Sequence, residues 1–250
     1  MKIDSTKIVM ISGGSRGIGA ALAFKMAMQG YKIAIGYNSS KNQAKKLQQK
    51  ILSNGGTSII VQVAVENRES IKDAIEYVAN ELGEIGILIN NAGISQVKNF
   101  LDITDKDLMK MLSVNLLGSF IFSQEIIPMM IKNNWGRIIN LSSIGGQFGG
   151  TNQIHYATAK SGLLGLTKSL AKLYAKNSIT INTVSPGLVE TDMTREEINS
   201  ENGKLKIKQI PMGRIAEMEE VISAIIFLTN DSSSYITGQC INVNGGMYFG

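Results

Sequence analysis

The chain has 250 residues, of which 44% are hydrophobic and 18% are charged, with 26 glycines and 3 prolines. This composition excludes a disordered, collagen-like or coiled-coil protein and predicts a single globular domain over residues 1–250. The net charge of +5 comes from lysines and arginines that are spread along the chain without a basic stripe, which argues against a nucleic-acid-binding protein.

The first predicted element is a short apolar run, residues 7–12, which stops at glycines and is typical of a β-strand. Charged residues such as Lys2 and Asp4 precede it, so we expect no signal peptide and a cytoplasmic protein. The lone cysteine, Cys240, excludes an intramolecular disulfide and a cysteine-ligated zinc site, and it fits a reducing compartment. No metal site is predicted.

Strands and helices alternate along the chain. The predicted strands cover residues 7–12, 31–36, 58–63, 87–90, 137–141, 179–184 and 239–243, and the predicted helices cover 18–29, 41–53, 70–82, 105–131, 156–175 and 217–228. Because parallel neighbours need a crossover, this order predicts an α/β, doubly wound (Rossmann-like) fold, a seven-stranded, mostly parallel sheet with helices on both faces. Polar residues and a proline interrupt the long apolar helix, so we predict a buried helix and no membrane span.

Residues 187–209 form the one long polar interruption of this alternation. Charges of both signs follow one another there with little periodicity. A stretch of this length inside a compact α/β domain is typical of a lid or binding loop. We predict a substrate lid at 187–209, with a solvated surface helix as the alternative.

A glycine-rich turn, GGSRGIG at residues 13–19, follows the first strand and opens the first helix. Glycine permits the unusual backbone angles of such a turn and lets a diphosphate approach bare main chain. The amide groups and the dipole at a helix N-terminus attract anions. The position of the motif between strand and helix therefore predicts a dinucleotide site rather than a purely structural turn.

The end of the second strand indicates which dinucleotide is bound. Proteins that prefer NAD usually carry Asp or Glu about 20 residues beyond the glycine turn, where it binds the ribose hydroxyls. Residues 36–41 contain no acid. A carboxylate would repel a 2′-phosphate, whereas Arg16, Asn38, Ser39 and Lys41 can donate hydrogen bonds to one. The sequence therefore favours NADP(H).

Tyr156 and Lys160 form a second candidate site. They lie four residues apart on a strongly helical stretch, so their side chains share one helix face. A tyrosine with its ordinary pKa is a poor acid or base at neutral pH, but a nearby ammonium group favours the phenolate. The pair predicts a proton donor and acceptor. Ser143, at the end of the preceding predicted strand, and Asn115, inside a predicted helix, become candidates only in combination with it.

Taken in chain order, these motifs resemble the short-chain dehydrogenase/reductase family over the whole length. The motifs are the glycine turn, Asn90–Gly93, Asn115, Ser143, Tyr156 with Lys160, and Pro186-Gly187. Within the family, GGSRGIG, the TDM of residues 191–193 and the ending VNGGMY of residues 243–248 are most similar to bacterial 3-oxoacyl-[acyl-carrier-protein] reductases. Paralogues that reduce acetoacetyl-CoA or other ketones share these motifs.

The resemblance implies a role for each matched residue. Ser143 would hydrogen-bond the substrate carbonyl, and Tyr156 would protonate that oxygen as hydride arrives from the nicotinamide. Lys160 would bind the nicotinamide ribose and lower the pKa of the tyrosine, and Asn115 would hold a water that links Lys160 to solvent. The implied cofactor-binding residues are Gly13, Ser15, Arg16, Gly17, Ile18, Gly19, Asn38, Ser39, Val65, Asn91, Ala92, Gly93, Tyr156, Lys160, Pro186, Gly187, Val189 and Thr191.

The chain departs from the family pattern at four positions. Ser12 replaces the usual threonine and keeps the hydroxyl, and Ala64 stands where an aspartate usually lies near the adenine. Reductases that act on acyl carrier protein often carry arginines at the ends of two long helices, where this chain has Asn134 and Asn177. Nearby cations are not equivalent to those arginines, so acyl carrier protein as a partner stays open.

The resemblance also implies a homotetramer in which the helices of Asn115 and Tyr156 pack against their mates. A helix that is apolar on more than one side, with Phe120, Met129 and Met130, agrees with a partner subunit. His155, the only histidine, points about 100° away from Tyr156 on the helix and is expected to pack or to border the substrate. Cys240 is expected in the core.

These features predict an NADPH-dependent reductase of 3-oxoacyl thioesters in fatty acid biosynthesis. The alternatives are an acetoacetyl-CoA reductase or another ketone, alcohol or sugar dehydrogenase of the same family. A non-catalytic NADP-binding protein is a more remote alternative, because it would have no chemical need for the full set of four site residues.

Overall fold

The computed structural model describes residues 8–192 and 194–250, and the predicted strands all occur in this part of the chain. They form one seven-stranded sheet in the order β3-β2-β1-β4-β5-β6-β7, and each neighbouring pair is parallel. The strands are β1 (Ile8–Ser12), β2 (Lys32–Tyr37), β3 (Thr57–Gln62), β4 (Ile85–Asn90), β5 (Gly136–Leu141), β6 (Ile179–Pro186) and β7 (Cys240–Val243). The predicted doubly wound fold is confirmed.

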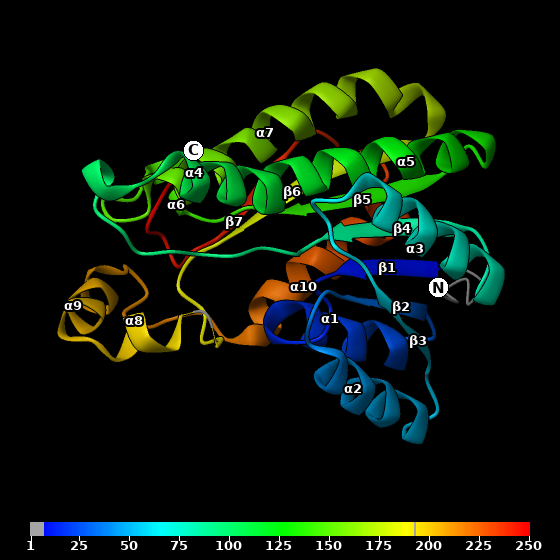
Figure 1. The fold of residues 1–250 in the computed structure, drawn as a ribbon, viewed down its shortest axis with the longest axis horizontal. Helices are drawn as coiled ribbons and strands as arrows, with labels where there is room; N and C mark the ends of the chain where they lie inside the picture. Colours follow the sequence, from blue (N-terminus) through cyan, green and yellow to red (C-terminus); the bar gives the residue numbers. More distant parts are fainter. Residues whose placement is uncertain (1–7, 193) are drawn as a thin grey trace.

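Helices cover both faces of the sheet (Figure 1). One face carries α1 (Gly17–Met28), α2 (Lys41–Ser53) and α10 (Met218–Thr229); the other carries α3 (Arg68–Glu81), α4 (Asp105–Leu112), α5 (Gly118–Lys132) and α7 (Ile154–Tyr174). These bounds agree with the predicted ones to within two residues, apart from the subdivision of the long helix. Shorter helical segments are η1 (Phe100–Asp102), η2 (Ser113–Leu117), α6 (Gly145–Phe148), η3 (Ala175–Asn177), α8 (Arg195–Asn199), α9 (Glu201–Gln209) and η4 (Asp231–Ser233).

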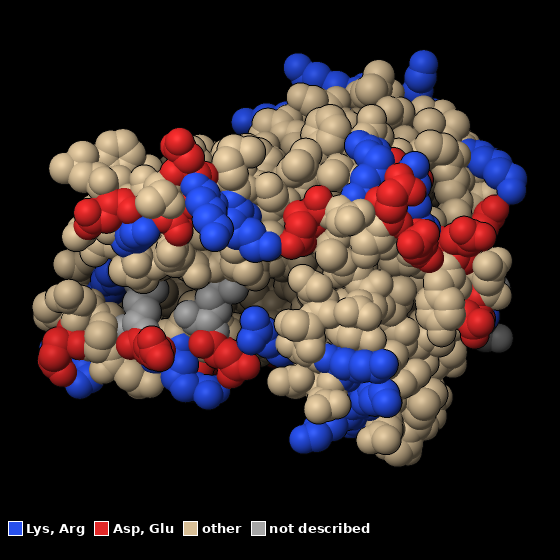
Figure 2. Space-filling view, in the orientation of Figure 1, with Lys and Arg blue, Asp and Glu red and all other residues tan. Residues whose placement is uncertain are grey.

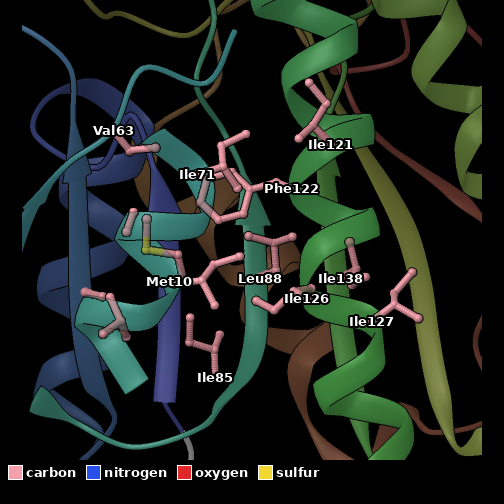
Figure 3. Close-up of a cluster of buried hydrophobic side chains, with 14 of the residues drawn as sticks. Met10, Val63, Ile71, Ile85, Leu88, Ile121, Phe122, Ile126, Ile127 and Ile138 are labelled. Atoms are coloured by element: carbon pink, nitrogen blue, oxygen red, sulfur yellow. The ribbon is translucent and has the colours of Figure 1, made fainter. Parts of the chain in front are cut away.

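The core has two layers because successive residues of a buried strand point to opposite faces. In β1, Met10 belongs to the cluster under α3 and α5, and Ile11 belongs to the cluster under α1 and α10. Figure 3 shows the first cluster, in which Leu88 of β4 and Phe122 of α5 lie close together, both fully buried. The apolar side chains of the strands thus pack against the apolar faces of the helices on both sides of the sheet.

The long helical run Asp105–Lys132 packs on this sheet, as predicted for a buried helix. Among the described residues it is the helix that is long and apolar enough to span a membrane by length and composition, and 56% of its apolar window is buried inside the molecule. Met130 is fully buried, whereas Phe120 is half exposed. The apolar surface of this helix that the sheet leaves uncovered therefore lies at Phe120 and its neighbours, and not at Met130.

The expectation that Cys240 belongs to the core is wrong. β7 is an edge strand of the sheet, and each of its four residues is only partly buried. Burial still raises the pKa of the Cys240 thiol above its usual value. Apolar neighbours in the sequence do not reveal that a strand pairs on one side only.

The topology places a switch point between β1 and β4. The chain leaves β1 toward α1 on one face and leaves β4 toward α4 on the opposite face. In open parallel sheets, ligands bind beyond the carboxyl ends of the strands at such a switch point. The glycine turn and residues 91–93 both follow these two strand ends.

Candidate functional site

The glycine turn has the backbone that its sequence predicts. Gly13 and Gly17 adopt φ angles of +62° and +54°, in the left-handed region that favours glycine. Arg16 caps α1 with extended backbone angles, and the first turn of α1 carries no acidic residue. The partial positive charge at this helix end is therefore not neutralised by α1 itself.

The segment after β4 is held directly against the glycine turn. The Asn91 side-chain amide donates to the carbonyl oxygens of Ser12 and Gly13, at 3.0 and 2.9 Å. The Ser12 hydroxyl oxygen accepts from the backbone amides of Asn91 and Ala92, both at 3.1 Å. Serine thus supplies these bonds in place of the usual threonine, and the bonds hold together the two segments that follow β1 and β4.

We predict that Gly19→Ala destabilises the protein, because a Cβ at this position would lie 2.6 Å from both Asn91 Nδ2 and Gly13 O. Overpacking of this kind costs about 1–3 kcal/mol. The measurement is the free energy of unfolding in urea. Gly165→Ala is the matched control, since its added Cβ meets no atom within 4 Å on α7 and alanine is favoured there by about 1 kcal/mol. Equal stability of the two variants would contradict the packing argument.

Three of the remaining cofactor-binding candidates follow β2 and β3, namely Asn38, Ser39 and Val65, whereas Arg16 lies in the glycine turn. Asn38, Ser39 and Arg16 are exposed, so their polar groups are accessible to a ligand. Val65 is different, because its side chain is buried and packs under Gly118, where an added Cβ would lie 2.9 Å from it. Of Val65, only the backbone is suited to contact a polar ligand.

Near the end of β3, the structure offers no carboxylate in place of the missing aspartate. The amide of Ala64 is bonded to the Ser70 hydroxyl at 3.0 Å. The next acid, Glu66, is bonded to Lys110 at 2.7 Å. No neighbour of Ala64 therefore supplies the carboxylate that the usual aspartate would place near the adenine.

The expected catalytic residues converge beyond the ends of β4 and β5. Tyr156 and Lys160 lie one turn apart on α7, and the Lys160 Nζ lies 5.9 Å from the centre of the Tyr156 ring. Gly93 lies against two of these residues, since a Cβ there would be 2.7 Å from Asn115 Oδ1 and 3.5 Å from Lys160 Nζ. Residues from three separate parts of the sequence thus meet at one point.

Lys160 is buried, with 4% of its surface exposed, and its Nζ donates to the Leu141 carbonyl oxygen at 2.6 Å. Removal of the ammonium group from water lowers the pKa of Lys160 to about 8. A buried lysine with a lowered pKa is unusual in a protein interior and is typical of a functional site.

Asn115 is fully buried in the π-helical turn η2, where the sequence predicted an ordinary helix. Its Oδ1 accepts from the amide of Ile94 at 3.1 Å, and its Nδ2 donates to the carbonyl oxygens of Ile94 and Met111 at 3.0 and 3.1 Å. Single π-helical turns recur at functional sites. Here the turn presents an amide to the chain that follows β4.

Ser143 and Tyr156 border the same glycine. A Cβ on Gly145 would lie 3.6 Å from Ser143 Oγ and 3.9 Å from Tyr156 Cε1. The Gly145 amide donates to Ser143 Oγ at 3.2 Å. That bond uses a lone pair of the hydroxyl, so the hydroxyl hydrogen can be directed elsewhere.

The segment after β6 closes the other side of the site. The Pro186 carbonyl accepts from the Ile144 amide at 2.9 Å, and Thr191 lies 3.7 Å from a Cβ built on Gly17. Val189 is buried and forms a β-bridge with Ala216. Of the two residues expected at the nicotinamide end, Pro186 therefore contacts the loop after β5 and Thr191 lies against the glycine turn, whereas Gly187 borders Asn244 and Val189 belongs to the core.

The bridge between Val189 and Ala216 also closes the base of the predicted lid. Between them the chain forms α8 and α9, which project beyond the carboxyl ends of the strands (Figure 1). Figure 2 shows that the molecule is hollowed between these helices and its main body. Met193 of the predicted motif lies outside the described residues.

The two asparagines that replace arginines lie away from this site. Asn134 precedes β5, and Asn177 ends η3 before β6, so both lie at the amino ends of the strands. Ser143 and Tyr156 lie beyond the carboxyl ends. Within one chain, therefore, positions 134 and 177 do not border the candidate active site.

Two sets of polar contacts were not predicted from the sequence, although Asn90 and His155 were themselves considered there. Asn90 donates to Asn140 at 2.9 Å, and Asn140 donates to Thr167 at 2.8 Å, in a buried chain across the sheet. Polar residues within otherwise apolar strands were the available signal. His155 is buried, as expected for a packing role, and it also hydrogen-bonds Gln96 at 2.9 Å, a contact that no local pattern signals.

Known proteins resemble the whole chain. The family described as "Enoyl-(Acyl carrier protein) reductase" matches residues 13–248. The chain is 43% identical to "3-oxoacyl-[acyl-carrier-protein] reductase FabG" of Aquifex aeolicus, over 97% of each chain. A protein of the same name from Salmonella typhimurium is 39% identical over 97% of each chain. Another, from Staphylococcus aureus, is 36% identical over 97% of this chain and 98% of the relative. The chain is an oxidoreductase that belongs to the short-chain dehydrogenase/reductase family.

Proposed function

We propose that the protein is an NADPH-dependent reductase that converts a 3-oxoacyl thioester to the 3-hydroxyacyl form. The observation that carries the proposal is the convergence of Asn115, Ser143, Tyr156 and Lys160 around Gly93 and Gly145. The names of relatives that cover nearly the whole chain support the substrate class.

The residues present fit a phosphorylated dinucleotide. Gly13 and Gly17 take the left-handed backbone angles that such a turn requires, and they lie next to the N-terminus of α1, whose first turn carries no acidic residue. The exposed Arg16, Asn38 and Ser39 would hold the 2′-phosphate, since none of them carries a negative charge. When bound, NADPH supplies the hydride.

Ser143 and Tyr156 would act on the substrate carbonyl oxygen. As that oxygen gains negative charge, the two hydroxyls donate hydrogen bonds to it, and such donors stabilise the developing alkoxide. The proton of the Tyr156 hydroxyl is then transferred to the oxygen, which gives the alcohol and leaves a phenolate. Ser143 keeps its own proton and orients the carbonyl.

Lys160 and Asn115 would support this proton transfer. The Lys160 ammonium, 5.9 Å from the centre of the Tyr156 ring, favours negative charge on the phenolic oxygen. It would also hydrogen-bond the nicotinamide ribose. Asn115, against Gly93 on the side of Lys160, would hold a water that returns a proton to the site.

The lid, the location and the assembly belong to the same proposal. Residues 187–209 would close over the substrate, because the bridge at their base leaves α8 and α9 as one projecting unit.

The protein would act in the cytoplasm as a homotetramer. A groove of about 410 Å³ between α5 and α7, lined by Phe120, Ile127, Pro128, Ile131, Leu166 and Leu170, supports burial of these helices against a second copy.

The carrier of the acyl chain distinguishes two candidate functions. Acyl carrier protein is acidic, and the arginines expected to meet it are replaced by Asn134 and Asn177. This replacement favours an acetoacetyl-CoA reductase as the second candidate. Both positions lie far from this chain's own active site, so carrier docking there would serve a partner subunit.

The test is NADPH oxidation with acetoacetyl-CoA and acetoacetyl-acyl carrier protein measured side by side. We expect turnover with the carrier-bound substrate. Turnover confined to the CoA ester would establish the second candidate. No turnover of either ester, with turnover of other ketones, would assign the protein to another dehydrogenase of the same family. NADPH binding without turnover of any substrate would establish a non-catalytic protein.

We predict that kcat/KM is higher with NADPH than with NADH by about tenfold or more, because each hydrogen bond to a charged group is worth about 1.5–3 kcal/mol. Asn38→Asp should reverse much of this preference by placing a carboxylate next to the 2′-phosphate. Asn54→Asp, after α2, is the matched control and should leave it unchanged. A wild-type preference for NADH would show that the end of β2 does not select the phosphate.

A further inference from the structure

A chain of side-chain hydrogen bonds joins the start of α7 to the start of α4. His155 Nε2 lies 2.9 Å from Gln96 Oε1, and Gln96 Nε2 donates to Asp107 Oδ1 at 3.2 Å. His155 immediately precedes Tyr156 on α7, Gln96 lies in the segment after β4, and Asp107 lies in the first turn of α4. Three elements that are separate in sequence are thus linked beside the catalytic tyrosine.

The direction of each bond follows from the ionised state of Asp107. Lys98 Nζ lies 2.6 Å from its carboxylate, and the hydroxyl and amide of Thr104 donate to it at 2.7 and 3.0 Å. These bonds, with that from Lys98 the strongest, hold the pKa of Asp107 well below its usual range. The carboxylate therefore accepts only, and the Gln96 amide group must turn its NH₂ toward it.

This orientation fixes the histidine as well. With its NH₂ directed at Asp107, Gln96 presents its carbonyl oxygen to His155, so His155 Nε2 must carry a hydrogen. The imidazole is 2% exposed, and its Nδ1 has no hydrogen-bond partner in the part of the chain that the structure describes. The contact with Gln96 is therefore the bond that orients this ring.

The segment that carries Gln96 is bonded on both sides. The Lys98 amide donates to the Asn152 carbonyl at 2.8 Å, just before α7, and Ile94 exchanges two bonds with the Asn115 side chain. Val97 between them is 69% exposed, so the polar residues on either side turn inward. The extended chain after β4 is thus bonded to the start of α7 and to the π-helical turn.

We propose that His155 and Gln96 are positioning residues that hold the first turn of α7, and with it Tyr156, at a fixed place relative to Gly93 and Asn115. The proposal rests on the reductase activity proposed above. Proton donors must be held within a fraction of an ångström of their productive geometry, and a displacement of about 1 Å can cost up to 10²-fold in rate. Loss of the link should therefore lower kcat while NADPH binding at the glycine turn is unchanged.

The experiment compares four variants. Gln96→Leu and His155→Phe keep the bulk and remove the bond, His155→Gln keeps a donor, and Asn99→Ala is an exposed control in the same segment. We expect Gln96→Leu and His155→Phe to lower kcat by about tenfold with the KM for NADPH within about twofold of wild type. His155→Gln should recover most of the loss, and Asn99→Ala should behave as wild type.

Hydrogen exchange measured by mass spectrometry supplies a readout that does not depend on the substrate. Peptides that cover residues 94–103 and 153–160 should exchange faster in Gln96→Leu than in wild type or Asn99→Ala. Unchanged exchange and kcat in Gln96→Leu would overturn the proposal. A His155→Gln variant no better than His155→Phe would assign packing, not the hydrogen bond, to His155.

The exchange data also separate this proposal from the proposed function. If the wild-type protein does not reduce 3-oxoacyl thioesters but Gln96→Leu still loosens the start of α7, the substrate assignment fails and the link stands. If His155→Phe does not fold, Gln96→Leu decides the matter, since Gln96 is only partly buried.

Discussion

Tyr156→Phe is expected to lower kcat for ketone reduction by about 10³-fold, within the range by which general acids accelerate reactions. The substitution removes one oxygen atom and keeps the ring. Ser143 borders the same glycine, Gly145, as the Tyr156 ring. Its hydroxyl is left in place by the substitution and can still orient the carbonyl. What is lost is the proton that the alkoxide needs.

NADPH affinity should change little in this variant. The glycine turn that would hold the diphosphate is fixed by bonds among Ser12, Gly13, Asn91 and Ala92, which the substitution at Tyr156 does not remove. We therefore expect the dissociation constant of NADPH, measured by titration of its fluorescence, to stay within about threefold of the wild-type value, or less than 1 kcal/mol. The defect should lie in kcat.

A matched tyrosine controls for the substitution itself. Tyr77 of α3 is 44% exposed and belongs to a helix on the same face of the sheet, so Tyr77→Phe should retain full activity. Turnover of Tyr156→Phe at a rate close to that of Tyr77→Phe would remove Tyr156 from its assigned role. The proton would then have to come from another group.

The sheet and its helices could be predicted from the sequence because each strand is an apolar run that ends at glycine or polar residues. The run of β1 stops at Gly13, and that of β4 stops at Asn90 and Asn91. The site residues that follow these ends were predictable for the same reason. A parallel sheet brings all its carboxyl ends to one edge, whatever their separation in sequence.

Features that depend on distant contacts could not be predicted in this way. The π-helical turn at Asn115 lies inside a continuous apolar pattern that an ordinary helix satisfies equally well. Gln96 and His155 are 59 residues apart, and neither belongs to a local motif. The edge position of Cys240 depends on strand pairing. A surface helix within 187–209 was only the alternative prediction, because α9 buries Gly203 alone among its residues and has almost no apolar periodicity.

Lys160→Met is expected to lower kcat by at least about 10²-fold, because the ammonium group that favours the phenolate of Tyr156 is removed. It should also change how stability depends on pH. In the folded apoprotein, burial lowers the pKa of Lys160 to about 8, whereas an unfolded lysine titrates near its ordinary value of about 10.4. Between these two values the unfolded chain binds more protons at this site than the folded one.

The sign of the effect follows from linkage. Where the unfolded state binds more protons, the free energy of unfolding rises with pH, by up to about 1.4 kcal/mol per pH unit for one group. Below pH 8 both states carry the proton, and this contribution is flat. Between pH 7.5 and 9.5 the wild type should therefore gain about 2 kcal/mol relative to Lys160→Met.

The comparison of variants isolates Lys160 from the other groups that titrate at alkaline pH. Loss of the bond to the Leu141 carbonyl destabilises Lys160→Met at every pH and cancels in the difference between two pH values. Lys168→Met, two turns along the same helix and exposed, should follow the wild-type pH dependence. Urea unfolding curves at pH 7.5 and 9.5 make the measurement. If the wild type and Lys160→Met show parallel pH dependence, the Lys160 ammonium does not lose its proton near pH 8, and it favours the Tyr156 phenolate with a full positive charge throughout this range.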